Sequence, residues 1–158
     1  MTDCCAINAD RTAPGVMPCP VNGTRSKRVE LLTVKSLVRR LPLEMSDAPY
    51  YFCEANDCDV VYFSSDPQMP VFRREDLLIR VGSKETRDPI SVCYCFGITR
   101  QDIEDEIRKT GHSTIGARIT REVKAGNCAC EVKNPSGKCC LGDIATVAKQ
   151  CIRATRGS

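Results

Sequence analysis

The sequence predicts an α+β protein made of two small domains, the first rich in β-strands and the second helical. The main observation is that the hydrophobic pattern changes from a period of two to a helical period after residues 83–89. A second observation is that 158 residues include twelve Cys but only four Phe, four Tyr and no Trp. With so few large apolar side chains, we expect bound metals to supplement the hydrophobic cores.

The first domain is predicted to consist of turns and short strands. Residues 1–25 are rich in Pro, Gly and Asn, which indicates a loop. Partial alternation predicts a strand over residues 28–34, and the apolar spacing at 37–41 predicts a short helix that ends before a proline. Aromatic and β-branched residues at 50–53 and 59–63 predict a hairpin whose loop has a cysteine at each end.

A polar segment separates the two halves of the chain. Before it, residues 67–70 are expected to form a turn, and short strands are expected at 71–72 and 77–81. The polar residues 83–89 then have the composition of a linker. We therefore predict one domain over residues 1–82 and a second over residues 90–158.

The second domain is predicted to contain three helices. Thr99 and Asp102 form a capping-box pattern that begins the first helix, and Gly111 ends it. Ser113 can cap a second helix, which is expected to end near Gly126. Apolar residues recur at helical spacing in each helix: Ile103 and Ile107; Ile115, Ile119 and Val123; Ile144, Val147, Ala148, Cys151 and Ile152.

Charge and hydropathy indicate whether the protein binds nucleic acid or enters a membrane. The net charge of +3 comes from 23 basic and 20 acidic residues in short, interrupted runs, which favours a solvated surface over a nucleic-acid interface. No stretch approaches the roughly 18 apolar residues of a membrane span, and the N-terminus lacks a signal-peptide pattern. We therefore expect a cytoplasmic protein with no membrane insertion and no nucleic-acid partner. A reducing compartment keeps thiols available to metals, which disfavours the alternative of a secreted disulfide scaffold.

Three cysteines of the first half are candidates for a zinc site. Cys53 and Cys58 flank the predicted hairpin loop, and Cys19 lies in the preceding turn region. Structural zinc takes four nitrogen or sulfur ligands, but Asn22 stands where a Cys-x-x-Cys pair with Cys19 would place the fourth. An open fourth position would leave the metal accessible, and the alternative to a metal site is a set of cysteines buried as small hydrophobes. The candidates for a fourth ligand that closes the site are Cys4 and Cys5.

Six further cysteines form three close pairs in the second half, namely Cys93 and Cys95, Cys128 and Cys130, and Cys139 and Cys140. Residues two apart in an extended chain point the same way, so such a pair does not readily form a disulfide but can share a metal cluster. Loops that enter helices present thiolates from several directions and offer backbone amides to sulfur. The pattern predicts a four-cysteine 2Fe-2S cluster, and helix N-termini just after Cys95 and around Cys140 are expected to stabilise its negative charge.

Two motifs make a family resemblance specific. Val92-Cys93-Tyr94-Cys95 and the segment from Cys130 to Cys140 resemble the 2Fe-2S domain of the bacterioferritin-associated ferredoxin type, as it occurs in the N-terminal half of CopZ-type copper chaperones. Residues 51–53, 58–63 and 80–85 resemble the zinc domain and linker of the same chaperones. The resemblance implies the cluster ligands Cys93, Cys95, Cys130 and Cys140 and the zinc ligands Cys19, Cys53 and Cys58.

The sequence also departs from that family. Asn22 stands where the family has a zinc cysteine, and Cys128 and Cys139 are spare. Such chaperones continue into a copper-binding domain with a Cys-x-x-Cys loop, a motif that this sequence does not contain.

We expect an electron carrier, rather than an enzyme, whose 2Fe-2S centre exchanges single electrons. The resemblance implies a link to copper handling, in which Cu(II) is reduced to Cu(I) for a chaperone or exporter, with Cu+ as cargo and a redox or copper-handling protein as partner. The alternative is a redox-inert adaptor that is stabilised by its metals and binds a protein partner. No phosphate loop or nucleophile motif occurs, and the single histidine, His112, is expected to have a capping or solvent-exposed role rather than a catalytic one.

Overall fold

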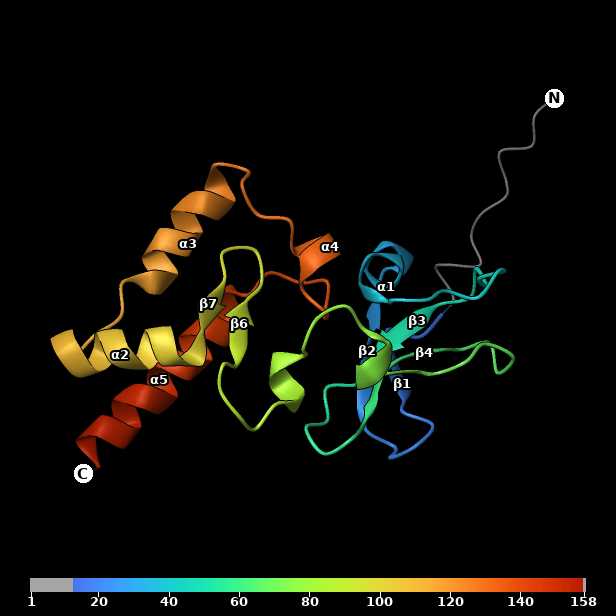
Figure 1. Ribbon diagram of the computed structural model, residues 1–158, viewed down its shortest axis with the longest axis horizontal. Coiled ribbons are helices and arrows are strands. Elements are labelled where there is room, and N and C mark those ends of the chain that lie inside the picture. The colour runs from blue at the N-terminus through green and yellow to red at the C-terminus, as the bar shows by residue number, and fades with distance from the viewer. Residues whose placement is uncertain (1–12, 158) are drawn as a thin grey trace. The chain divides into compact units, whose positions relative to one another are not determined.

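The computed structural model describes residues 13–157. The chain divides after Ile79 into two compact units, here termed the N-terminal and C-terminal units (Figure 1). Each unit contains its own cluster of buried apolar residues.

A five-stranded antiparallel sheet forms the centre of the N-terminal unit (Figure 1). Neighbouring strands in this sheet are also neighbours in the sequence, and the connection between the second and third strands, residues 30–49, contains a helix. Helix α1 (Leu31–Leu37) follows the second strand, and a short 3-10 turn, η1 (Arg74–Asp76), follows the last. The strands are β1 (Val16–Pro18), β2 (Arg25–Val29), β3 (Tyr50–Phe52), β4 (Val60–Ser64) and β5 (Phe72–Arg73).

The predicted hairpin is confirmed by the pairing of β3 with β4. Tyr51 lies opposite Phe63 with ring centroids 5.5 Å apart, and Phe52 lies opposite Tyr62 at 6.0 Å. Because alternate residues of a strand face opposite sides of the sheet, these two pairs lie on different faces. Tyr51 and Phe63 belong to the buried cluster that also contains Cys19, Cys53 and Cys58.

Other predictions for this unit are wrong in detail. Residues 28–34 do not form one strand, because β2 ends at Val29 and α1 begins at Leu31, where a helix places Val34 and Leu37 on its buried side. The strand expected at 77–81 is absent, and Leu77 forms only an isolated bridge with Val38. Strand β1 lies within the segment that was expected to be a loop.

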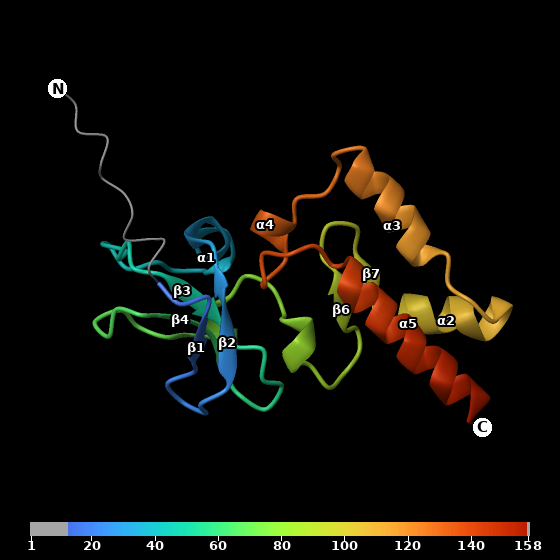
Figure 2. The same cartoon turned by 180° about the vertical axis from the view of Figure 1, so that it is seen from behind.

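The C-terminal unit combines a small hairpin with helices (Figure 2). Helices α2 and α3 both pack against α5, and these contacts enclose Ile103, Ile119 and Ile144. The three predicted helices are confirmed by α2, α3 and α5, whereas the hairpin and the short α4 were not predicted. The elements are η2 (Gly82–Lys84, a 3-10 turn), β6 (Ser91–Cys93), β7 (Ile98–Thr99), α2 (Arg100–Thr110), α3 (Ile115–Lys124), α4 (Cys130–Lys133) and α5 (Leu141–Arg156).

The predicted capping residues can be compared with the observed ends of helices α2 and α3. The capping box of α2 is confirmed, because the Asp102 N–H donates to Thr99 Oγ1 (3.2 Å) and the Thr99 N–H donates to Asp102 Oδ2 (2.8 Å). Gly111 ends α2 with a φ of 81°. Ser113 Oγ accepts from the Ile115 N–H at 3.3 Å, although Thr114 occupies the N-cap position of α3. The expected helix start just after Cys95 is wrong, because β7 intervenes before α2.

Two further findings bear on the class of protein. None of the described helices is long and apolar enough to cross a membrane. Every cysteine in residues 13–157 has a free thiol rather than a disulfide bond.

Candidate metal centres

Three buried cysteines converge in the N-terminal unit and form what we call the three-sulfur site, Cys19, Cys53 and Cys58. Their sulfur atoms all lie within 4.8 Å of one another, and the Cys19 and Cys58 sulfurs are 4.0 Å apart. Sulfurs that ligate one zinc ion at about 2.3 Å in a tetrahedron lie about 3.8 Å apart. The three thiols therefore have the spacing that a single metal ion requires.

The hairpin and the preceding turn position these three sulfurs. Cys53 directly follows β3, and its N–H donates to the Val61 carbonyl of β4 (2.9 Å), so the hairpin ladder fixes one side of the site. Cys19 directly follows β1, and its N–H donates to the Thr24 carbonyl (2.8 Å). A tight turn then returns the chain, with the Gly23 N–H donating to the Cys19 carbonyl and a Gly23 φ of 74°.

The Cys19 thiol lies in a setting that favours its thiolate. Burial raises the pKa of Cys19, but hydrogen bonds from the backbone of Asn22 and Val21 and from the thiols of Cys53 and Cys58 outweigh burial and lower this pKa below its ordinary value. Backbone N–H groups that point at a cysteine sulfur also stabilise a metal-bound thiolate.

Asn22, at the sequence position where a fourth ligand was sought, stabilises the turn that follows Cys19. Its side-chain oxygen accepts a hydrogen bond from the Thr24 N–H at 2.9 Å, within an exposed turn. No Cys, His, Asp or Glu among residues 13–157 joins the three sulfurs as a fourth potential ligand. The predicted fourth ligands Cys4 and Cys5 lie outside the described residues.

The second group of thiols lies in the C-terminal unit, where we define the four-thiol site as Cys93, Cys95, Cys130 and Cys140. The Cys95 and Cys130 sulfurs are 3.5 Å apart. The Cys93 thiol lies within hydrogen-bonding range of the Cys140 thiol, and Cys130 interacts with Cys140 in turn. Two touching pairs of sulfurs are thus brought together from the β6–β7 hairpin, the start of α4 and the start of α5.

Burial keeps the thiols of Cys130 and Cys140 protonated in the absence of a metal. Burial, with the hydrogen bond and charge of the neighbouring Cys95 sulfur, raises the pKa of Cys130 to about 12. Burial and the adjacent Cys93 sulfur also raise the pKa of Cys140. Metal binding at this site therefore releases protons, because thiolates are the binding form.

Backbone amides surround the same sulfurs. The Ala129 N–H donates to the Cys95 sulfur at 3.3 Å, and the Cys140 backbone N–H donates to the Cys130 sulfur. Cys140 is also the N-cap residue of α5, as the sequence predicted, so the positive end of a 16-residue helix faces the site. The site combines four soft ligands with donors that favour negative charge.

A compact turn fixes the spacing between Cys130 and Cys140. Asn134 is buried, and its side-chain amide donates to the Lys138 carbonyl at 2.9 Å. The same side chain accepts hydrogen bonds from both the N–H and the hydroxyl of Ser136. This role of Asn134 was not predicted, although Asn-Pro-Ser-Gly is a turn signal in the sequence.

Tyr94 fastens the Cys93-Tyr94-Cys95 loop to turn η2. Its hydroxyl oxygen accepts a hydrogen bond from the Gly82 N–H at 2.7 Å, and burial raises the pKa of Tyr94. A Cβ atom on Gly82 would lie 2.1 Å from the Ser91 carbonyl oxygen, so the approach requires glycine. The link between Gly82 and Tyr94 could not be predicted from the sequence, because only contact in space joins them.

The remaining cysteines and the histidine have different surroundings. Cys151 is buried in the core of the C-terminal unit, which confirms the packing role expected for it. Cys139 is exposed and Cys128 is half-buried. His112 is exposed, as predicted, and its Nδ1 lies 3.1 Å from the Thr110 carbonyl oxygen.

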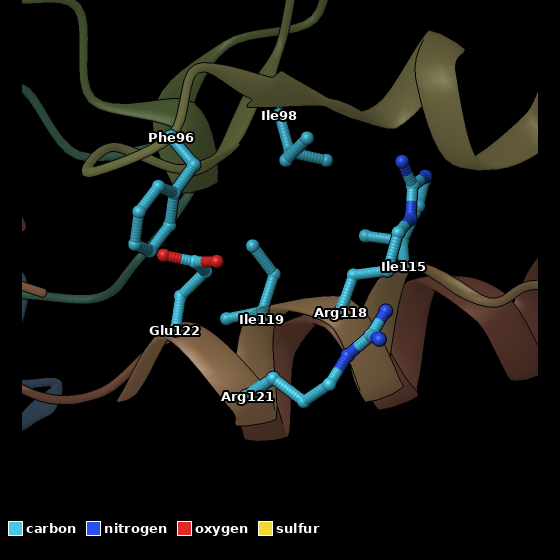
Figure 3. A pocket seen from close by; sticks show the side chains of 7 residues that line it. All are labelled: Phe96, Ile98, Ile115, Arg118, Ile119, Arg121 and Glu122. Carbon is cyan, nitrogen blue, oxygen red and sulfur yellow. The ribbon is translucent and has the colours of Figure 1, made fainter. Parts of the chain in front are cut away.

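A groove of about 520 Å³ lies between α3 and the β6–β7 hairpin (Figure 3). Its position is next to the loop of the four-thiol site, because Phe96 follows Cys95. Arg118 at its rim pairs with Glu106 (3.2 Å), and Glu122 accepts a hydrogen bond from Asn127 (2.8 Å). The groove is lined by apolar side chains and carries both basic and acidic side chains at its rim, so its charge favours no single class of ligand. The lining residues are Phe96, Ile98, Ile115, Arg118, Ile119, Arg121 and Glu122.

Comparisons with known proteins point to one group of relatives. A family model of the CopZ type, described as a zinc binding domain, matches residues 16–78, which include the three-sulfur site. The copper chaperone CopZ of Archaeoglobus fulgidus is 37% identical over 125 residues, covering 79% of this chain and 58% of the chaperone. The X-ray structure of the Archaeoglobus fulgidus CopZ N-terminal domain aligns with a TM-score of 0.66 and 34% identity, covering 83% of this chain and 97% of that domain.

Proposed function

The chain belongs to the family of the CopZ N-terminal domain, and we propose that it is an electron-transfer protein that contains zinc and a 2Fe-2S cluster and serves copper handling. The observation that carries the electron-transfer part is the meeting of Cys95 and Cys130, whose sulfurs are 3.5 Å apart, beside Cys93 and Cys140.

The donor set of the four-thiol site fits a 2Fe-2S cluster. Such a cluster takes four cysteine thiolates, shared equally between its two irons. The contacts of Cys95 with Cys130 and of Cys93 with Cys140 supply two pairs of sulfurs. In addition, no three of these sulfurs lie as close together as those of the three-sulfur site, the one single-ion group within residues 13–157. Paired sulfurs suit a two-iron core better than a lone ion.

The surrounding residues are suited to hold a redox centre. When bound, a 2Fe-2S cluster accepts and releases one electron at a time. The N–H groups of Ala129 and Cys140 donate to the Cys95 and Cys130 sulfurs and so stabilise added negative charge. Cys93 and Cys140 are 0% and 2% exposed, which limits the access of water, whereas Cys95 is half-buried. We infer that electrons enter and leave on the Cys95 side.

Zinc in the N-terminal unit has a mainly structural role in this proposal. Cys19, Cys53 and Cys58 are part of the buried cluster, together with Tyr51 and Phe63. A metal that ties the β1–β2 turn to the β3–β4 hairpin adds folding free energy to that of the buried aromatic residues. In this proposal the N-terminal unit is the zinc domain and the C-terminal unit is the cluster domain, as the sequence predicted.

The copper part of the proposal rests on relatives. The chain spans 58% of the length of the Archaeoglobus fulgidus copper chaperone that it matches. We infer that this chain passes single electrons to Cu(II), giving Cu(I) for a copper-handling partner protein. Each Cu(II) ion consumes one electron, so the reduced protein must be regenerated by a redox partner.

A Cu(II) reduction assay tests the proposal against a redox-inert adaptor. Anaerobic protein is reduced, freed of excess reductant and mixed with Cu(II), and Cu(I) is measured with a chromophoric Cu(I) chelator. The proposal predicts about one Cu(I) per cluster, and a large loss of this yield in Cys95→Ser. An adaptor with purely structural metals would give the same low yield in both proteins.

A further inference from the structure

Asn134 is a buried amide between two of the proposed cluster ligands. The residue is only 4% exposed, and its side chain forms hydrogen bonds with Ser136 and Lys138. We propose that Asn134 is a positioning residue that sets the reduction potential of the cluster, because it keeps the Cys140 N–H pointing at the Cys130 sulfur. This inference rests on the proposed function, since it requires a 2Fe-2S cluster at the four-thiol site.

The first argument is that Asn134 connects the two ends of the turn. Its backbone N–H donates to the Cys130 carbonyl at 2.9 Å, which anchors the residue to the first ligand. Its side-chain Nδ2 donates to the Lys138 carbonyl, also at 2.9 Å. Lys138 lies two residues before Cys140, so Asn134 links the backbone of one ligand to the backbone that leads into the other.

The second argument is the number of bonds that hold this connection. The Asn134 side-chain oxygen accepts from the Ser136 N–H at 3.0 Å and from its hydroxyl at 2.9 Å. The Ser136 hydroxyl oxygen in turn accepts from the Lys138 N–H at 3.3 Å. Gly137, with a φ of 70°, donates its N–H to the Asn134 carbonyl at 2.8 Å. Both backbone polar groups of Lys138 are thus held, which fixes the direction in which the chain enters Cys140.

The third argument is the role of the Cys140 N–H. It donates to the Cys130 sulfur, so this hydrogen bond joins the two ends of the turn. Cys130 and Cys140 are 7% and 2% exposed, so water does not readily replace this donor. A donor to a cluster sulfur favours the reduced form, because reduction adds a negative charge. The orientation of this N–H therefore contributes to the reduction potential.

Asparagine suits this position because one planar amide both donates and accepts hydrogen bonds. An aspartate would keep the acceptor for Ser136 but would lose the donor to the Lys138 carbonyl. An alanine would lose both halves of the connection while leaving the proposed ligands unchanged. Asn134→Ala is therefore the informative substitution, since it changes neither the number of thiols nor the charge.

The test measures the midpoint reduction potential of the full chain by anaerobic titration, followed by the spin signal of the reduced cluster. In Asn134→Ala, the ratio of reduced to oxidised cluster at a fixed potential should fall by about tenfold, which is about 59 mV for a one-electron couple. Ser136→Ala removes only the hydroxyl that contacts Asn134 and Lys138, and this ratio should fall by about threefold. Iron and sulfide are measured on the same samples, so that potentials are compared only between loaded proteins.

Asn127→Ala serves as the matched control. Asn127 is an exposed asparagine of the same unit, and its side chain donates to Glu122 at 2.8 Å rather than to the turn between Cys130 and Cys140. Its substitution removes one side-chain amide and should leave the reduction potential at the wild-type value.

Two outcomes would overturn the inference while leaving the proposed electron-transfer function standing. One is a wild-type potential in loaded Asn134→Ala, or in Ser136→Ala where Asn134→Ala does not retain the cluster. The other is an equal shift in Asn127→Ala, which would mean that any loosening of the unit changes the potential. A wild-type protein without iron, sulfide or a spin signal would instead overturn the inference and the proposed function together.

Discussion

The sulfur atoms of Cys95 and Cys130 lie 3.5 Å apart although 35 positions of sequence separate them. The Ala129 N–H also donates to the Cys95 sulfur, so this contact ties the hairpin loop to the start of α4. We predict that Cys95→Ser and Cys130→Ser each lose most of the bound iron and sulfide, because each removes one cluster thiolate. The measurement is iron and sulfide per chain after anaerobic purification.

The neighbouring cysteines supply matched controls for that prediction. Cys128 is half-buried and Cys139 is exposed, and each is next or nearly next in sequence to a proposed ligand. Cys128→Ser and Cys139→Ser should keep iron and sulfide at the wild-type level. Equal loss in all four variants would mean that the proposed ligand set is wrong.

Substitution of Gly82 tests the support of the Cys93–Cys95 loop. In Gly82→Ala the new Cβ would lie 2.1 Å from the Ser91 carbonyl oxygen, so the backbone must shift and the hydrogen bond to Tyr94 is strained. We expect the free energy of unfolding of the C-terminal unit to fall by about 1–3 kcal/mol. Denaturant unfolding measures the effect, and iron retention should fall as well.

The control for this substitution is another glycine of the same unit. A Cβ on Gly142, in α5, meets nothing within 4 Å. Gly142→Ala should therefore leave stability unchanged or raise it by up to about 1 kcal/mol. A similar destabilisation by both alanines would show that the close approach at Gly82 does not matter.

Glu106 is expected to make the C-terminal unit sensitive to acid. Its carboxylate accepts a hydrogen bond from the Thr114 N–H and pairs with Arg118 at 3.2 Å, and these contacts lower the pKa of Glu106. A lowered folded-state pKa contributes stability that is present above the ordinary carboxyl pKa and is lost as the pH falls through the folded-state value. Glu106→Gln should therefore cost about 1 kcal/mol at neutral pH and progressively less in acid.

Glu104 serves as the matched carboxylate for this experiment. It pairs with Arg108 on the exposed face of α2 at 2.9 Å. The difference in unfolding free energy between Glu106→Gln and Glu104→Gln isolates the contacts of Glu106 with Thr114 and Arg118, because both variants experience the same loss of metal in acid. A difference that stays constant from neutral pH to about pH 3 would contradict the assigned role of Glu106.

Removal of zinc should loosen the N-terminal unit alone. Cys53 continues β3, and Cys58 precedes β4, so a metal at the three-sulfur site holds both ends of this hairpin loop. After treatment with a zinc chelator, we expect amide hydrogen exchange in β3 and β4 to accelerate by about tenfold or more, with α5 unaffected. Unchanged exchange in β3 and β4 would show that zinc does not stabilise the sheet.

Local sequence signals predicted the elements that local interactions determine. The Thr99–Asp102 capping box and the Gly111 stop fix both ends of α2 within a few residues of chain, so the sequence pattern was sufficient. The aromatic residues of β3 and β4 likewise pair across a short loop. By contrast, the Leu31–Leu37 segment contains Thr33 and Val34, which suit a strand, yet burial of Thr33, Val34 and Leu37 on one side favours a helix.

The structural features that the sequence did not predict depend on contacts between segments that are distant in the chain. The segment at 77–81 has the composition of a strand, but β5 already occupies the edge of the sheet next to β4, and Leu78 is 58% exposed. Sequence spacing grouped the later cysteines, but it could not say which member of the Cys139–Cys140 pair faces inward. The structure assigns that difference to the start of α5, where Cys140 is 2% exposed as the N-cap residue and Cys139 points to solvent.

The measurement that tests the central claim most directly is metal and sulfide analysis of anaerobically purified protein, combined with an electron-spin spectrum after reduction. The proposed function predicts red-brown protein with about two irons, two sulfides and one zinc per chain, and a spin signal that appears on reduction and disappears on reoxidation. Stoichiometric zinc with no iron, no sulfide and no spin signal would contradict it.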